Sequence, residues 1–140
     1  MGIVNKQFLY GFIKKQLLAV LTTVNEKSLP EAALIGIAVT PELEIVFDTF
    51  NTSRKYQNII QNTAVALVIG WDNEITLQYE GIATELKEDD TFYREIYFDT
   101  FKDGRQRAEA MHGIVHLKIT PNWVRYCDYN DPTIIKELTL

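Results

Sequence analysis

The sequence predicts a mainly β (α+β) fold in which antiparallel strands close into a small barrel with a few helices at its periphery. Two observations support this fold class. Seven or so short apolar runs rich in β-forming residues follow one another, and most of them are joined by tight turns. Only single helical segments interrupt these runs, whereas a doubly wound parallel sheet alternates strands and helices regularly. No linker, repeat or change of composition divides the chain, so residues 1–140 are expected to form one domain.

The first third of the chain is predicted to contain one helix and three strands. Apolar residues recur at helical spacing over residues 5–16, which predicts an amphipathic helix. The three strands are expected at residues 17–24, 32–39 and 43–48. The polar sequence NEKSLP and the dipeptide Pro41–Glu42 are typical of turns and separate these strands.

The middle of the chain is predicted to contain a second helix between strands. This helix is expected at residues 53–62. The almost wholly apolar run at residues 64–71 favours a strand that is buried on both faces, followed by a hairpin turn. Apolar and polar residues alternate in the next strand, at residues 74–85, so one of its faces is expected to be solvated. Gly81 within it indicates a bulge or a close backbone approach.

The last third is predicted to contain one helix and two strands. The helix is expected at residues 89–101, with Asp89 or Asp90 as its cap and the dipeptide Asp103–Gly104 ending it. The strands are expected at residues 114–119 and 123–129.

Composition excludes several classes of protein. The formal charge of −5 disfavours general binding to nucleic acid or to an anionic membrane, so neither is expected as a partner. A single cysteine, Cys127, cannot form an internal disulfide, which is typical of a reducing compartment. No apolar run approaches the roughly 20 residues of a membrane span, and the amino terminus does not resemble a secretory signal. The expected location is therefore cytoplasmic.

The segment IVFDTFNTSRKYQN, residues 45–58, carries the pattern most informative about function. A strand here runs into a helix whose first turn holds Arg54 and Lys55. Cations at the positive end of a helix dipole cost a few tenths of a kcal/mol each, roughly, and an anion would relieve that cost. Hydroxyl donors stand beside them: Thr49, Thr52 and Ser53. Unpaired helix N–H groups, hydroxyls and cations are the groups that bind phosphate in proteins. A phosphate-bearing cofactor is therefore the main hypothesis for this segment, and a solvated basic turn is the alternative.

The order of these elements resembles a known family. The sequence FDTFNTSRKYQNIIQNTAVALVIGW, followed by a hairpin, YEGIATEL and ITPNWVRY, is similar to the flavin mononucleotide (FMN)-binding split barrels of the pyridoxamine 5′-phosphate oxidase family, in its general stress protein branch. The resemblance spans residues 17–129. It implies an antiparallel Greek-key split β-barrel, FMN as cofactor, and a homodimer with FMN at the interface.

The resemblance also implies which residues contact the cofactor. Strand-end residues Asp48 and Thr49 would lie against the flavin, and Arg54 and Lys55 would hold its phosphate. Trp123 would reach the flavin from the partner subunit. The complete set of expected cofactor-binding residues is Asp48, Thr49, Thr52, Ser53, Arg54, Lys55, Thr76, Gln78 and Trp123. No metal ligands and no catalytic acid or base are identified.

One departure from the family narrows the expected activity. The stretch AALIGIAV, residues 32–39, is uncharged where the true oxidase carries an arginine and a lysine, so oxidation of pyridoxamine phosphate is not expected. The chain is expected to be an FMN-dependent oxidoreductase acting on a small-molecule substrate or electron donor. Two alternatives remain open: a flavin-binding, stress-related module without turnover, and a haem-binding split barrel that uses His112 or His116.

Overall fold

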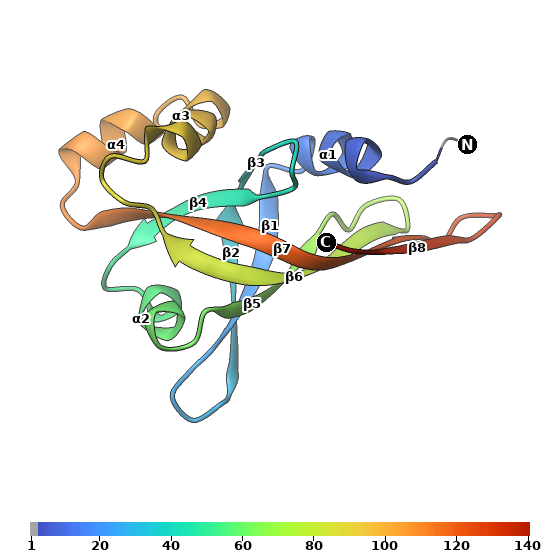
Figure 1. Ribbon diagram of the computed structural model, residues 1–140, viewed down its shortest axis with the longest axis horizontal. Helices are drawn as coiled ribbons and strands as arrows, with labels where there is room; N and C mark the ends of the chain where they lie inside the picture. Colours follow the sequence, from blue (N-terminus) through green and yellow to red (C-terminus); the bar gives the residue numbers. More distant parts are fainter. Residues whose placement is uncertain (1–2) are drawn as a thin grey trace.

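The structure is a computed structural model that describes residues 3–140 (Figure 1). Its strands form one antiparallel sheet, in the order β2-β1-β5-β6-β7-β4-β3, with β8 paired to β7. The strands are β1 (Leu18–Val24), β2 (Pro30–Gly36), β3 (Ala38–Val39), β4 (Ile45–Phe50), β5 (Ala64–Ile69), β6 (Ile75–Glu85), β7 (Ile114–Asp128) and β8 (Ile134–Thr139). The helices are α1 (Lys6–Lys14), α2 (Arg54–Gln61), α3 (Thr91–Thr100) and α4 (Gly104–Ala110).

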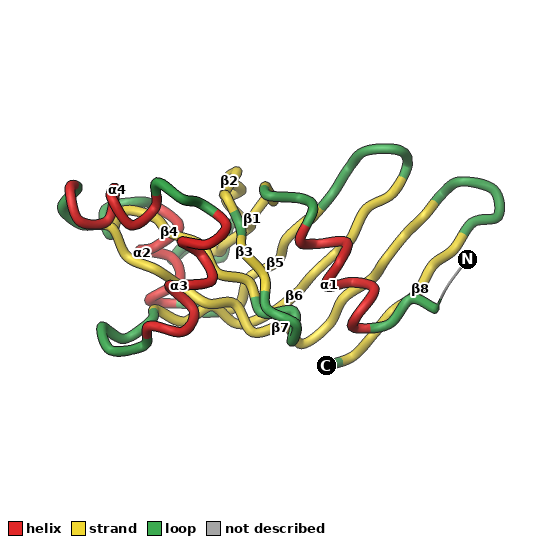
Figure 2. Tube along the Cα trace, turned by 90° about the horizontal axis from the view of Figure 1, so that it is seen from above, coloured by secondary structure: helices red, strands yellow, loops and turns green. Residues whose placement is uncertain are grey.

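The sheet curls into a half-barrel, as the split-barrel prediction requires. Helix α2 packs on β1 and β6, and α3 packs on β3 and β4. Figure 2 shows α2, α3 and α4 gathered at one end of the sheet, with α1 and β8 toward the other. Within the described residues, no helix has the length and apolar character needed to cross a membrane.

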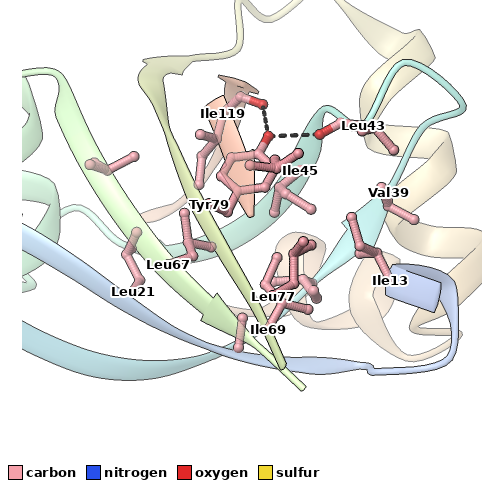
Figure 3. Packing of buried hydrophobic residues seen from close by; sticks show 14 of the residues in the cluster. Ile13, Leu21, Val39, Leu43, Ile45, Leu67, Ile69, Leu77, Tyr79 and Ile119 are labelled. Carbon is pink, nitrogen blue, oxygen red and sulfur yellow. Dashed lines mark hydrogen bonds between the residues drawn. The ribbon is translucent and has the colours of Figure 1, made fainter. Parts of the chain in front are cut away.

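The core fills the concave side of the sheet, and one buried tyrosine joins three parts of it. The hydroxyl of Tyr79 on β6 donates its one hydrogen between the backbone oxygens of Leu43, at 2.7 Å, and Ile119, at 3.2 Å (Figure 3). Burial raises the pKa of this phenol far above its usual range, so the hydroxyl keeps its proton. The ring is 1% exposed among aliphatic side chains. Tyr79 therefore adds a polar group whose single donor is satisfied to an otherwise apolar core.

A β-bulge interrupts the long β6–β7 pair where the sequence predicted one. The pairing register shifts between Glu80 and Gly81, so that Glu80 faces Trp123 and Gly81 faces Pro121. A Cβ at Gly81 would lie closer than van der Waals distance to the backbone oxygen of Thr120. Glycine is required here because the backbone of β7 occupies the space of a side chain.

Most predicted elements are confirmed, but the face assignment of β5 was wrong. Val65, Leu67 and Ile69 are buried, whereas Ala64, Ala66 and Val68 are exposed. The strand is apolar on both faces, but in the single chain only the inner face is covered. The apolar run therefore predicted the strand correctly, but its prediction that both faces of the strand are buried was incorrect.

The carboxy-terminal third also differs from the prediction. Gly104 does not end a helical region but begins α4, and its lack of a Cβ lets Phe98 and Tyr97 approach closely. The two predicted strands over residues 114–129 are one continuous strand, β7, because Pro121 lies opposite the bulge where the ladder is already interrupted. The sequence analysis also missed β8, an amphipathic edge strand paired with β7.

Candidate functional site

The phosphate motif lies where β4 runs into α2. Ser53 caps the helix, its Oγ accepting a hydrogen bond from the backbone N–H of Tyr56 at 3.2 Å. Thr49 Oγ1 donates to Ser53 Oγ at 3.0 Å, and Lys55 Nζ donates to Thr49 Oγ1 at 3.5 Å. The first N–H groups of a helix have no partner within it, so those of Arg54 and Lys55 complete a group of donors. The predicted residues Thr49, Ser53 and Lys55 are thus brought together.

Arg54 stands beside this group and pairs with a carboxylate that the sequence analysis did not identify. Its NH1 atom lies 3.3 Å from Glu31 Oε2, and its side chain is 76% exposed. Glu31 is more enclosed, because the side-chain amides of Asn58 and Asn25 donate to its two carboxylate oxygens at 2.8 and 3.2 Å. These two hydrogen bonds, with a smaller contribution from Arg54, hold the pKa of Glu31 below its usual value.

A hollow of about 130 Å³ opens at this point. It is lined by Thr23, Glu31, Ala32, Ala33, Arg54 and Lys55. The two alanines belong to the uncharged stretch of β2, so small side chains leave the space in which an anion could meet both cations. Lys55 forms no ion pair within residues 3–140.

Two other predicted residues of the motif lie differently. Thr52 is exposed and precedes the cap, since Ser53 rather than Thr52 is the N-cap residue. The side chain of Asp48 points toward α4, where its Oδ2 atom lies 3.1 Å from NH2 of Arg107. Only the backbone of Asp48 is therefore available to the donor group at α2.

The remaining predicted residues lie on the face of the sheet opposite the core residue Tyr79, which we call the outer sheet face. Gln78 and Trp123 line a second hollow of about 160 Å³. This hollow shares no lining residue with the one at Arg54. Thr76 lies on the same strand as Gln78, two residues earlier, and its buried Oγ1 has no hydrogen-bond partner among the described residues. The nine predicted residues thus do not form one site within a single chain.

The outer sheet face is largely apolar and uncovered. Strand register aligns Leu34, Val20, Val68 and Gln78 across four neighbouring strands. The next row consists of Ala32, Thr22, Ala66, Glu80 and Trp123. Leu34 is 60% exposed and Val68 is 41% exposed. Antiparallel sheets that face water normally carry polar residues on that side, so this face has the character of an interface.

The two histidines named for a haem site lie in different surroundings. His112 is exposed in the turn before β7, while His116 is buried opposite Asp48 on β4. The His116 ring lies edge-on to Tyr97 and Phe98, with centroids 5.5 and 5.4 Å away. Its Nε2 has no hydrogen-bond partner in the described part of the chain. Burial lowers the pKa of His116, with the nearby Asp48 opposing this shift.

The sequence analysis missed the polar network around Glu31. Asn58 Nδ2 donates to Thr23 Oγ1 at 2.9 Å as well as to Glu31, and Asn58 is only 7% exposed. One signal was available, because Asn58 follows Arg54 by four residues and so shares its face of α2. The partner residues lie more than 20 positions away in the chain, which no local pattern reveals.

Comparisons with solved structures identify proteins of similar fold. General Stress Protein 26 from Bacillus anthracis str. Sterne is 25% identical, with a TM-score of 0.74, over 96% of this chain and 98% of that one. A putative pyridoxamine 5′-phosphate oxidase from Listeria innocua is 23% identical, with a TM-score of 0.73, over 86% of this chain and 96% of that one. A haem-binding protein from Mycobacterium smegmatis is 12% identical, with a TM-score of 0.82, over 99% and 60%.

Comparisons of sequence are consistent with these neighbours. No curated protein sequence matches the chain. The family model described as pyridoxamine 5′-phosphate oxidase matches residues 6–128, which include every element from α1 to the end of β7. The chain therefore belongs to the pyridoxamine 5′-phosphate oxidase family.

Proposed function

We propose that this protein binds FMN and holds the phosphate at the N-terminus of α2. The observation that carries the proposal is the donor group formed by Thr49, Ser53 and Lys55, with the exposed guanidinium of Arg54 beside it. Cations are unfavourable at the start of a helix unless an anion joins them. Membership of the pyridoxamine 5′-phosphate oxidase family, whose members often bind flavin, supports the choice of a flavin phosphate over other anions.

The residues of this region fit the cofactor. Helix N–H groups, two hydroxyls and two cations suit a phosphate monoester. On the outer sheet face, away from α2, the unpartnered Oγ1 of Thr76 and the exposed amide of Gln78 suit the polar edge of a flavin ring. Bound flavin would supply the exchange of a hydride or single electrons with small molecules. The protein would fix its position and exclude water.

We further propose that the flavin site is completed by a second copy of the chain. Within one chain, the hollow lined by Arg54 and the hollow lined by Trp123 share no residue. A homodimer would cover the apolar rows of the outer sheet face and let Trp123 of the second copy approach a flavin whose phosphate is held at α2. Closed two-fold dimers are the commonest way to bury such a surface.

The proposed activity is that of an FMN-dependent oxidoreductase acting on a small substrate. Its physiological electron donor would be a nicotinamide nucleotide or another small reductant. We do not expect oxidation of pyridoxamine phosphate, because β2 and β3 carry no cation that could hold the substrate's phosphate. Steady-state oxidation of NADH or NADPH by flavin-loaded protein, faster than by free flavin, supports an enzyme. No turnover with any acceptor supports a flavin-binding module instead.

The phosphate position is tested by truncating Arg54. We expect Arg54→Ala to weaken FMN binding about ten- to a hundredfold, since it removes a charge-assisted phosphate contact worth about 1.5–3 kcal/mol. Binding is measured by quenching of flavin fluorescence. Arg105→Ala is the matched control, because Arg105 pairs with Glu95 on the surface of α3 and α4 and should not affect binding. An Arg54→Ala affinity within twofold of the parent contradicts this placement.

Haem binding is a second candidate, favoured by His116. This histidine is buried with an unpartnered Nε2 and lines a cavity of about 410 Å³ beside Phe98. Adding hemin should then give a Soret band that His116→Ala abolishes and His112→Ala preserves. A spectrum unchanged from free hemin, or a band that survives in His116→Ala, counts against a haem site at this histidine.

A further inference from the structure

We propose that Glu31 competes with the bound phosphate for Arg54 and so determines how tightly the α2 site holds its anion. This inference rests on the proposed function, because it concerns the affinity of that same site. It assigns to Glu31 a role that opposes binding, although the residue lines the same hollow as Arg54 and Lys55.

The geometry makes Glu31 the fixed member of the pair and Arg54 the movable one. The side chain of Glu31 is 21% exposed, against 76% for Arg54. Asn58 and Asn25 each donate to one of its carboxylate oxygens, and Asn58 is itself held by Thr23. An anchored carboxylate thus faces a solvent-exposed guanidinium, 3.3 Å from Oε2 to NH1.

This carboxylate is charged wherever the protein is folded near neutral pH. Hydrogen bonds from Asn58 and Asn25, together with the charge of Arg54, lower the pKa of Glu31. A phosphate monoester near pH 7 carries a charge of about −1.5 to −2. When it enters the hollow it meets two cations and one resident anion. The phosphate must share Arg54 with Glu31 or displace it.

Neutralising Glu31 should therefore strengthen phosphate binding. In Glu31→Gln, the side chain keeps its size, while the repulsion is removed and Arg54 becomes available for a bidentate contact. We expect FMN to bind about three- to fivefold more tightly, near the upper end of what a partly exposed ion pair can supply. Riboflavin has no phosphate, so its affinity should change less than twofold.

The experiment compares the dissociation constants of FMN and riboflavin for the parent chain, Glu31→Gln and Glu42→Gln. Glu42 is the matched control because it is an exposed carboxylate paired with Lys6 and does not line the hollow. The Glu42→Gln variant should bind FMN and riboflavin with the same affinities as the parent. In the Arg54→Ala background, Glu31→Gln should strengthen FMN binding less than it does in the parent, since only the direct repulsion between Glu31 and the phosphate is left to remove.

The outcomes separate this inference from the proposed function. An FMN affinity of Glu31→Gln within twofold of the parent overturns the inference. An equal change in the affinities for FMN and riboflavin also overturns it, because such a change indicates a structural role for Glu31. FMN binding to neither the parent nor the variant overturns the proposed function and the inference with it. If Glu31→Gln does not fold, Glu31→Thr, a neutral strand former, should give the same selective strengthening.

Discussion

His116 connects the burial of a single residue to the stability of the whole protein. Its pKa in the folded state lies below the ordinary value of 6.5 because the ring is removed from water. Between the lowered pKa and 6.5, the unfolded chain binds a proton at this residue and the folded chain does not. Stability therefore rises with pH across that window and is lost as pH falls through it.

The expected result is a fall in the free energy of unfolding between about pH 7.5 and about pH 5.5, at most about 1.4 kcal/mol per pH unit. Urea denaturation at a series of pH values measures it. His116→Phe keeps an aromatic ring beside Tyr97 and Phe98 and should flatten the profile. His112→Gln alters an exposed histidine and should leave the profile as it is. Parallel profiles for His116→Phe and the parent would show that burial of this imidazole does not control the pH dependence.

For single residues of the α2 site, the sequence predicted the hydrogen-bond donors but not the carboxylate that pairs with one of them. A hydroxyl cap at Thr52 or Ser53, and Arg54 and Lys55 as the first-turn cations, follow from local helix rules, and the structure assigns the cap to Ser53. The pairing of Arg54 with Glu31 joins β2 to α2 across 23 positions. Such a contact depends on how the sheet brings the two elements together. A local sequence pattern therefore does not reveal the ion pair of Arg54 with Glu31.

Two glycines offer a comparison at the scale of single elements. A Cβ on Gly81 would clash with the backbone oxygen of Thr120, so Gly81→Ala must shift β6 against β7. We expect it to lower the free energy of unfolding by about 1–3 kcal/mol, as overpacking does. Gly11 lies inside α1 and is exposed, and a methyl group added there would meet no neighbouring atom within 4 Å.

Gly11→Ala should therefore raise stability by about 0.5–1 kcal/mol, because alanine is the better helix former. Chemical denaturation of both variants tests the pair. Equal effects of the two substitutions would mean that the bulge tolerates a side chain and that the close approach of β7 is not a constraint.

The success of prediction for whole elements followed the strength of their local signals. Helices α1 and α2 have side-chain N-caps and begin where the sequence indicated. In contrast, Asp103 forms no side-chain cap hydrogen bond before α4, and the same Asp–Gly pair is typical of a helix end. The seven residues of α4 have no apolar periodicity of their own. Arg107 forms a local ion pair with Asp103, at 2.7 Å, and a tertiary ion pair with Asp48, at 3.1 Å, and the second ties the helix to β4.

For the molecule as a whole, the unexplained feature is the outer sheet face. The sequence showed that β5 is apolar throughout, and the structure shows that half of it faces away from the core. No element within residues 3–140 covers that half. The prediction of burial on both faces would hold in a dimer, because a second copy could cover the exposed rows.

The last prediction tests that dimer through Val68, which lies in β5 and is 41% exposed. If the outer sheet face is the interface, light scattering of the parent should give about twice the mass of one 16.1 kDa chain. Val68→Glu places a charge among Val20, Leu34 and Gln78 and should give the mass of one chain. Its folding should be unaffected, since the side chain lies outside the core.

Phe92→Glu is the matched control, because Phe92 is 61% exposed on α3, which packs on β3 and β4 rather than on the apolar rows. It should remain dimeric and bind FMN as the parent does. Val68→Glu should also bind FMN at least about tenfold more weakly, since Trp123 of a second copy would no longer reach the flavin. A Val68→Glu protein that remains dimeric would place the interface elsewhere. A monomeric Val68→Glu protein with full FMN affinity would instead show that one chain suffices for the cofactor.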